Sequence, residues 1–217
     1  MIATPQKPNA CLFHLNFKTT GHIILPMSKP NTRDQIFDAA MKLLSQRAFN
    51  ACSVQDITTE AGVPKGSFYN HFESKEALAA EIVGHYGELG KWRDMLLDDS
   101  VPALERLKRY FTIVNGRMAE RGYQHGCMIG NMSAELAEQS PVIRGQLGEV
   151  YKNWTAKLEY AVAAGQREGT IPDKTSAQVL ASFLLNAWEG TILRVRVERS
   201  SVPFEQFMDL AFNKILA

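Results

Sequence analysis

Apolar residues recur at helical spacing along the chain from Asn31 nearly to its C-terminal end. Ile36, Ala40, Leu43 and Leu44 stand at the i, i+4, i+7 and i+8 positions that place side chains on one buried face of a helix. No stretch alternates apolar and polar residues between turn signals, as a half-buried β-strand would. The pattern therefore predicts an all-α protein.

Capping and turn residues divide this pattern into short and long helices. Ser53 and Asp56 have the spacing of a capping box that opens a short helix, and Gly62 ends it. Pro64 stands where a next helix begins, and Ser74 caps a longer one. Further helices are predicted at about 101–120, 127–138, 141–168, 174–197 and 204–216.

The chain divides into three parts, at residues 1–27, 28–75 and 76–217. The first part holds three prolines and no acidic residue, and it lacks the ordered regions of a signal peptide. We expect a disordered leader or an over-extended start, with Met27 as the natural beginning. The alternative is an accessory DNA-contacting arm that uses Lys18 and Lys29.

The second part contains a helix-turn-helix between Ser53 and Phe72, with the sequence SVQDITTEAGVPKGSFYNHF. A helix that enters a DNA major groove is short and presents small or polar residues. Phe68 and Phe72 are spaced i, i+4, so both should turn inward and anchor the second helix. The residues left to face outward are Lys65, Gly66, Ser67, Tyr69, Asn70 and His71.

The charge distribution agrees with a local contact to a polyanion. The net charge of +1 argues against a polybasic coat on nucleic acid. Residues 1–75, however, hold eight basic and five acidic residues, whereas the remainder holds sixteen and eighteen. Three scattered cysteines, Cys11, Cys52 and Cys127, fit a reducing cytosol, and no apolar run reaches membrane-spanning length. We therefore expect a cytoplasmic protein without a membrane partner.

The run VPKGSFYNHF at 63–72, followed by SKEAL at 74–78, resembles the signature of the TetR/AcrR family of transcriptional regulators, over residues 33–82. The resemblance implies a dimeric, ligand-responsive repressor that binds double-stranded operator DNA. By the same resemblance, Ser53, Tyr69, His71 and Lys75 would contact phosphates. The residues near the base edges would be Lys65, Gly66, Ser67 and Asn70, and Pro64 belongs to the same DNA-binding set. The alternatives are that Tyr69 is core, His71 is structural and Lys75 is merely solvated.

The third part, a helical body, carries all three tryptophans, which in helices are more often core than ligand-binding. Trp188 and Glu189 are the candidates for a pocket, because a buried glutamate is costly unless it is paired. Residues 176–197 are apolar on more than one face, and a second apolar stripe follows over 204–216. Pairing across a two-fold axis would bury both stripes and suit a palindromic operator; the alternative is internal core. The predicted dimer residues are Phe183, Leu184, Phe204, Phe207, Met208 and Ala211.

Cys127 is the candidate reactive group of the body. Gly126 breaks the preceding helix and leaves Cys127 near the start of the next, where the helix N-terminus, His125 and Arg121 would favour a thiolate. The alternative is a small buried apolar residue. The run GCMIGN at 126–131, with WEGTILR at 188–194, resembles a subset of the same family that includes acrylate- and electrophile-responsive repressors. In the electrophile-responsive type, the cysteine that matches Cys127 takes part in sensing.

This second resemblance implies an effector that is an electrophile or a small unsaturated acid. The implied effector residues are Cys127, Asn131, Trp188, Glu189 and Arg194, with Arg196 a further candidate partner for a carboxylate. The alternative is a regulator of an efflux or catabolic gene with a non-covalent hydrophobic ligand.

Two other classes of protein fit less well. Glu135 and Glu138 are spaced as on a solvated helix face, and His125 with Cys127 is a poor metal signal. No catalytic triad context, P-loop or dinucleotide fingerprint is present, so we expect no enzyme, metal or cofactor. A constitutive architectural DNA binder is disfavoured by the near-neutral charge and the large body.

Overall fold

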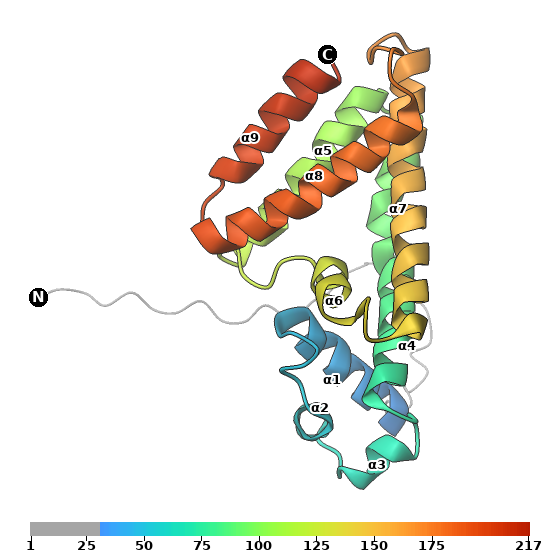
Figure 1. Ribbon diagram of the computed structural model, residues 1–217, viewed down its shortest axis with the longest axis vertical. Coiled ribbons are helices and arrows are strands. Elements are labelled where there is room, and N and C mark those ends of the chain that lie inside the picture. Colours follow the sequence, from blue (N-terminus) through green and yellow to red (C-terminus); the bar gives the residue numbers. More distant parts are fainter. Residues whose placement is uncertain (1–30) are drawn as a thin grey trace, which may run out of the picture. The chain divides into compact units, whose positions relative to one another are not determined.

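The computed structural model describes residues 31–217, so the expectations for residues 1–27, Lys18 and Lys29 lie outside the described residues. The described part contains helices and turns and no strand, as the pattern predicts (Figure 1). Its elements are α1 (Thr32–Gln46), α2 (Val54–Ala61), α3 (Gly66–Tyr69), α4 (Lys75–Glu88), the 3₁₀-helix η1 (Leu89–Leu97), α5 (Ala103–Glu120), α6 (Met128–Leu136), α7 (Pro141–Arg167), α8 (Ala177–Glu198), α9 (Val202–Leu210) and the π-helical turn η2 (Ala211–Ile215).

Side-chain caps fix where the N-terminal helices begin and end. The Asn31 side chain accepts a hydrogen bond from the backbone N–H of Asp34 at 2.9 Å, which opens α1. Ser53 and Asp56 form both bonds of the predicted capping box at the start of α2. Gly62 ends α2 at φ +69°, a left-handed conformation that glycine adopts without steric cost. Ser74 Oγ accepts from Ala77 N–H at 3.0 Å and caps α4 as predicted.

The first three helices form a small head around one apolar core. Ile36 and Leu44 of α1, Ile57 of α2 and Phe68 of α3 are all buried. Phe72, which follows α3, is also buried, so both phenylalanines turn inward as their spacing predicts. These rings hold the short α3 in place, since four residues form no independent helix.

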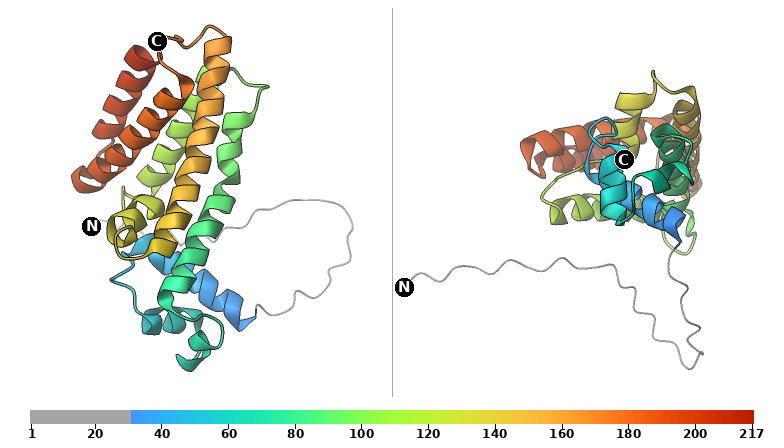
Figure 2. Two further views of the ribbon diagram at one scale, coloured as in Figure 1. Left: turned by 45° about the vertical axis from the view of Figure 1, so that its right-hand side comes forward. Right: turned by 90° about the horizontal axis from the view of Figure 1, so that it is seen from below.

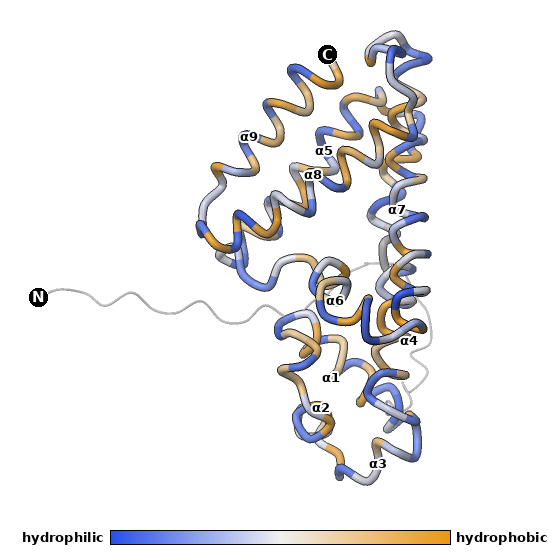
Figure 3. The backbone as a smooth tube through the Cα atoms, viewed as in Figure 1, coloured by the Kyte–Doolittle hydropathy of each residue, from blue (hydrophilic) through white to orange (hydrophobic). Residues whose placement is uncertain are grey.

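The body is built around the long helix α7. This helix packs against α4, α5 and α8, and α8 in turn packs against α9 (Figure 2). Figure 3 shows hydrophobic and hydrophilic positions alternating along α7, because one side of the helix lies in the core and the other faces solvent. Leu158 and Ala161 of α7 are fully buried with Leu107 and Phe111 of α5.

A single helix, α4, takes part in both the head and the body. Helix α4 packs against α1 at one level and against α7 at another, and it continues directly into η1. The tighter winding of a 3₁₀-helix changes which side chains face inward, and in η1 it buries Arg93 and Leu96. The sequence pattern does not reveal this change of winding.

Residues around α6 also contact the head. The carboxylate of Glu135 accepts the backbone N–H groups of Phe49 at 3.2 Å and Asn50 at 2.9 Å. His125 Nδ1 lies 2.8 Å from the carbonyl oxygen of Gln46, at the end of α1. Glu138 is exposed as its spacing predicts, but Glu135 is not on a solvated face, because its carboxylate binds the turn between α1 and α2.

Two negative findings concern the described residues alone. None of the helices over 31–217 is long and apolar enough to cross a membrane. Within the same residues, no group of three or more His, Cys, Asp or Glu side chains is arranged to hold a metal ion.

Two glycines of α7 provide a test of the packing. A Cβ at Gly165 would lie 2.5 Å from Ile171 Cδ1 and 2.8 Å from its Cγ1, whereas a Cβ at Gly148 would meet nothing within 4 Å. We expect Gly165→Ala to lower the free energy of unfolding by about 1–3 kcal/mol through overpacking. Gly148→Ala should raise it by about 0.5–1 kcal/mol, because alanine is the better helix former. Urea unfolding measures both, and a change of equal sign in the two variants would contradict this packing.

Candidate functional site

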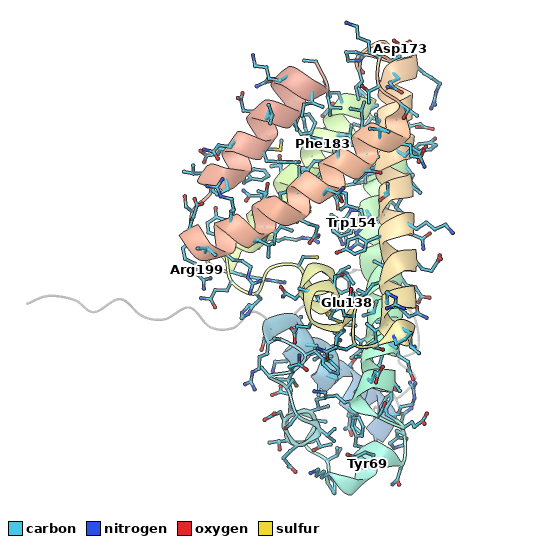
Figure 4. The ribbon with its side chains drawn as sticks, in the orientation of Figure 1. Tyr69, Glu138, Trp154, Asp173, Phe183 and Arg199 are labelled. Atoms are coloured by element: carbon cyan, nitrogen blue, oxygen red, sulfur yellow. The ribbon has the colours of Figure 1, made fainter. Side chains whose placement is uncertain are left out.

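Helix α3 presents a set of exposed side chains at the end of the head that lies away from the body. The backbone N–H of Ser67 donates to Pro64 O at 2.9 Å, which starts the turn where the proline predicts it. Phe68 is fully buried and fixes the rotation of the helix. Tyr69, next to it, is 59% exposed and points outward (Figure 4). Tyr69 is therefore not a core residue.

The other predicted DNA-contacting residues of this segment share that exposed side. Pro64, Lys65, Gly66, Asn70 and His71 are exposed, and Ser67 is half-buried. A Cβ at Gly66 would meet nothing within 4 Å, and its φ is not in the left-handed region. The fold itself therefore does not require glycine at this position. A glycine at this position leaves the backbone of α3 uncovered on its outer side.

Two residues that are predicted to contact phosphates, Ser53 and Lys75, have hydrogen-bond partners inside the head. Ser53 Oγ donates to Asp56 Oδ2 at 2.6 Å, and this bond holds the pKa of Asp56 below its usual value. The ammonium of Lys75 donates to Phe49 O at 3.0 Å and to Cys52 O at 2.7 Å, and lies 3.9 Å from the centre of the Phe49 ring. Lys75 is thus not simply solvated, because two of its three N–H groups tie the turn between α1 and α2 to α4.

Cys127 is the N-cap residue of α6, as predicted, but it is buried and its thiol is not activated. Burial and the neighbouring carboxyl of Glu189 raise the pKa of Cys127 well above its usual value. The backbone amides of Gly130 and Ile129 act in the opposite direction and are outweighed. The expectation that the helix N-terminus would favour a thiolate is therefore wrong, because the cost of desolvation is larger.

Glu189 lies against the first turn of α6. Any side chain at Gly130 would collide with Glu189 Oε2, so the glycine leaves the space that this carboxyl fills. Glu189 Oε1 is buried without a hydrogen-bond partner, and burial raises the pKa of the carboxyl. The structure thus brings Cys127 and Glu189 together as a thiol and a carboxyl that both tend to keep their protons.

Asn131 joins this cluster through an arginine, but not through Arg194. Arg196 donates to Asn131 Oδ1 at 2.8 Å, and Asn131 Nδ2 donates to His125 O at 2.9 Å. Arg194 instead is largely exposed and pairs with Glu198 on the surface of α8. The prediction of Arg194 as an effector residue is thus not supported by its position, and Arg196 is the arginine that reaches α6.

Trp188 is a core residue. It is 1% exposed and its ring centre lies 5.4–5.8 Å from those of Phe111, Phe204 and Phe207. Its indole N–H has no hydrogen-bond partner. Trp188 and Glu189 are consecutive in α8 and therefore project in different directions, so that the tryptophan packs on α5 and α9 and the glutamate on α6.

The sequence analysis missed Arg93, which is the most unusual charged residue of the body. Arg93 is 4% exposed, and its guanidinium carbon lies 4.5 Å from the centre of the Trp154 ring and 5.3 Å from that of Trp92. Figure 4 shows Trp154 on the side of α7 that faces the interior of the body. Tyr110, also fully buried, stacks on Trp92 at 5.1 Å. An arginine in a polar stretch carries no sequence signal of burial.

The predicted dimer residues differ in how far their side chains are exposed on the surface of one protomer. Leu184, Phe204, Phe207 and Ala211 are buried within the protomer, so they are core residues rather than a surface for a partner. Phe183 is 42% exposed, and Met208 is half-buried. The exposed apolar residues of α8 and α9 are Val179, Phe183, Leu193, Val197, Val202 and Leu210.

Comparisons with known proteins agree with this arrangement. Residues 36–82 match the family of bacterial regulatory proteins named after tetR, and residues 103–211 match the tetracyclin repressor-like C-terminal domain. The HTH-type transcriptional repressor DhaR of Mycobacterium sp. (strain GP1) is 35% identical over 192 residues, which cover 88% of this chain and 95% of DhaR. The transcriptional regulator AcuR of Cereibacter sphaeroides is 28% identical over 78% of each chain.

A solved structure shows the same fold. The reduced form of NemR from E. coli superimposes with a TM-score of 0.78 and 25% identity, covering 86% of this chain and 97% of that one. The helix-turn-helix head with its exposed α3, the helical body and the two matched domains lead to one conclusion. The chain belongs to the TetR family of transcriptional regulators, whose members bind DNA and are not enzymes.

Proposed function

We propose that this chain is a cytoplasmic repressor that binds a palindromic operator as a homodimer and releases it when a small effector enters the body. The observation that carries the proposal is the outward face of α3, where Lys65, Tyr69 and His71 are exposed while Phe68 is buried beneath them. In this proposal residues 28–75 bind DNA, and residues 76–217 bind the effector and form the dimer.

The chemistry of the α3 face suits a major groove. The Tyr69 and His71 side chains can donate to phosphates, and Asn70 has the donor and acceptor needed to read a base edge. Lys65, which the resemblance places near the base edges, can also reach a phosphate with its ammonium. Gly66 has no side chain and Ser67 a small one, so the backbone of α3 can come close to the DNA. Ser53, at the N-cap of α2, is exposed, and its hydroxyl can donate to a phosphate by turning away from Asp56 Oδ2, while its oxygen still accepts the Asp56 N–H that caps the helix.

The dimer is proposed to form through the apolar residues that α8 and α9 leave exposed. Phe183 and Leu210 line a groove of about 210 Å³ between these helices, together with half-buried Ala187 and Ile215. A repeated apolar surface on two adjacent helices is typical of a two-fold contact, in which the same patch meets its own copy. Met208 of α9 is half-buried and belongs to the same proposed interface.

The effector is proposed to bind reversibly in the body, near Cys127, Asn131 and Glu189. The buried, protonated thiol of Cys127 supports a non-covalent small ligand, such as an unsaturated organic acid, over an electrophile captured by a thiolate. Trp188, which packs on α5 and α9, would support this part of α8 from the core without touching the effector. Binding would favour a conformation of the dimer in which the two heads no longer fit the operator spacing.

The assignment of the α3 face can be tested with Lys65→Ala and Tyr69→Phe. Both side chains are exposed, so the melting temperature should change little, while affinity for an operator selected from random duplexes should fall roughly fivefold or more. The slope of log affinity against log salt should also decrease by about one for Lys65→Ala. Gel-shift titrations at several salt concentrations measure both effects. Lys152→Ala, on the exposed side of α7, is the matched control, and wild-type affinity in both head variants would refute the assignment.

A second prediction concerns the reactivity of Cys127. Because burial and Glu189 raise the pKa of its thiol, iodoacetamide at pH 7.5 should alkylate Cys127 at least about tenfold more slowly than free cysteine. The rate should still be rising above pH 9. Peptide mass spectrometry separates Cys127 from the other two cysteines. Cys127→Ser should keep its response to a reversible effector, and rapid labelling of Cys127 at neutral pH would instead support covalent sensing.

A further inference from the structure

The body contains two buried arginines whose surroundings differ. Arg106, 1% exposed, donates to Asp99 Oδ1 at 2.9 Å and to the Leu96 carbonyl at 3.1 Å, with Glu168 also within ion-pair distance. Arg93, 4% exposed, forms no ion pair with any carboxylate in the described part of the chain. A buried charge is costly unless it is paired, so Arg93 lacks the anion that Arg106 has.

Aromatic rings surround Arg93 in place of carboxylates. The guanidinium carbon lies 4.5 Å from the ring centre of Trp154, 5.3 Å from that of Trp92 and 5.7 Å from that of Tyr86. Cation–π contacts of this kind stabilise the charge, but a ring face offers no lone pair in the plane of the guanidinium. The Nε–H of Arg93 is buried without a hydrogen-bond partner.

Three polar groups at this place lack a hydrogen-bond partner. They are Arg93 Nε, the indole Nε1 of Trp154 and the hydroxyl of Tyr110. Arginine and tryptophan nitrogens are donors only, and a tyrosine hydroxyl can donate as well. Arg93 and Trp154 both lie close enough to the Tyr110 oxygen to lower the pKa of that hydroxyl, although burial raises it overall. Donors from η1 and α7 thus converge on the Tyr110 hydroxyl of α5, and no carboxylate in the described part of the chain forms an ion pair with Arg93.

We propose that Arg93, Tyr110 and Trp154 bind the carboxylate of a small organic acid, whose apolar part packs against the rings of Trp92 and Tyr86, and that this acid is the effector. A carboxylate has two oxygens with about four acceptor sites, which matches a guanidinium with two further donors. The aromatic walls suit an apolar body rather than a free inorganic anion. Only one part of this inference, that the bound acid is the effector, rests on the proposed function.

Glu189 does not act as the anionic partner of Arg93 within the protein. The positive charge of Arg93 lowers the pKa of Glu189, but burial outweighs it and raises that pKa overall, and the two side chains form no ion pair. Glu189 Oε1 stays without a partner in the interior that Arg93 also faces. An acid bound at Arg93 therefore adds a negative charge that the fold does not supply.

The place of Arg93 in the fold connects this site to the head. Arg93 lies in η1, which continues from α4, and α4 packs against α1. A stretch of 3₁₀-helix within a longer helical path is a common place for a hinge. A carboxylate that holds Arg93 restrains η1 and, through α4, biases the position of the head.

The experiment compares acids with their own amides on the full chain. Butyrate, crotonate, benzoate and phenylacetate are each paired with the neutral amide of the same carbon skeleton, and thermal unfolding and calorimetric titration are recorded. We expect at least one acid to raise the melting temperature by about 3 °C or more at saturation, while its amide does not. Equal effects of acid and amide, no binding by any acid, or equal protection by chloride or phosphate would overturn the proposal.

Variants then locate the site. Arg93→Gln should weaken binding of the acid at least about tenfold, and Tyr110→Phe, which removes only the hydroxyl, should weaken it roughly three- to tenfold. Arg109→Gln, an exposed arginine of α5, is the matched control and should bind as wild type does. Should Arg93→Gln fail to fold, Tyr110→Phe and the comparison of acid with amide decide the question. Wild-type affinity in Tyr110→Phe and in folded Arg93→Gln would refute the site.

Operator binding separates this inference from the proposed function. We expect the acid to release wild-type protein from the operator, and Tyr110→Phe to need a correspondingly higher concentration of acid. Release by a neutral compound alone would leave the repressor function intact and refute the carboxylate site. Binding of the acid at Arg93 without any operator binding would support the site and refute the repressor.

Discussion

The packing of α4 against both α1 and α7 is the contact on which the rest of this protein depends. Leu78 and Ile82 are fully buried, and they lie on a helix that starts at the DNA-binding head and continues into the interior of the body. Because cores are close-packed, a displacement of η1 cannot be absorbed locally within the body. In the proposed mechanism, the surface of α3 and the buried charge of Arg93 are linked through α4.

Local sequence signals were enough to predict the helices. Ser53, Gly62 and Ser74 act through hydrogen bonds and φ values that depend on residues at most four positions away, so the sequence alone contains the information. The inward turn of Phe68 and Phe72 follows from their spacing in the same way. The exposed face of α3 was also predictable, since it is what remains after the two phenylalanines are buried.

Features that depend on distant contacts were not predictable. Lys75 finds its carbonyl partners 23 and 26 residues away, and Glu135 reaches the head across 85 and 86 residues. In α8, apolar residues cover two faces, so the pattern alone could not show that Leu184 is core while Phe183 is exposed. The burial of Arg93 depends on the 3₁₀ winding of η1, and no periodic pattern of apolar residues in the sequence marks that winding.

The contact of Glu189 with α6 has a consequence for the first turn of that helix. The carboxyl of Glu189 occupies the volume in which a side chain at position 130 would lie, and the two residues are 59 positions apart in the chain. A side chain at position 130 would therefore force this carboxyl to turn away or the first turn of α6 to move. Glycine at position 130 thus decides how closely α8 can bring an acidic group to the start of α6.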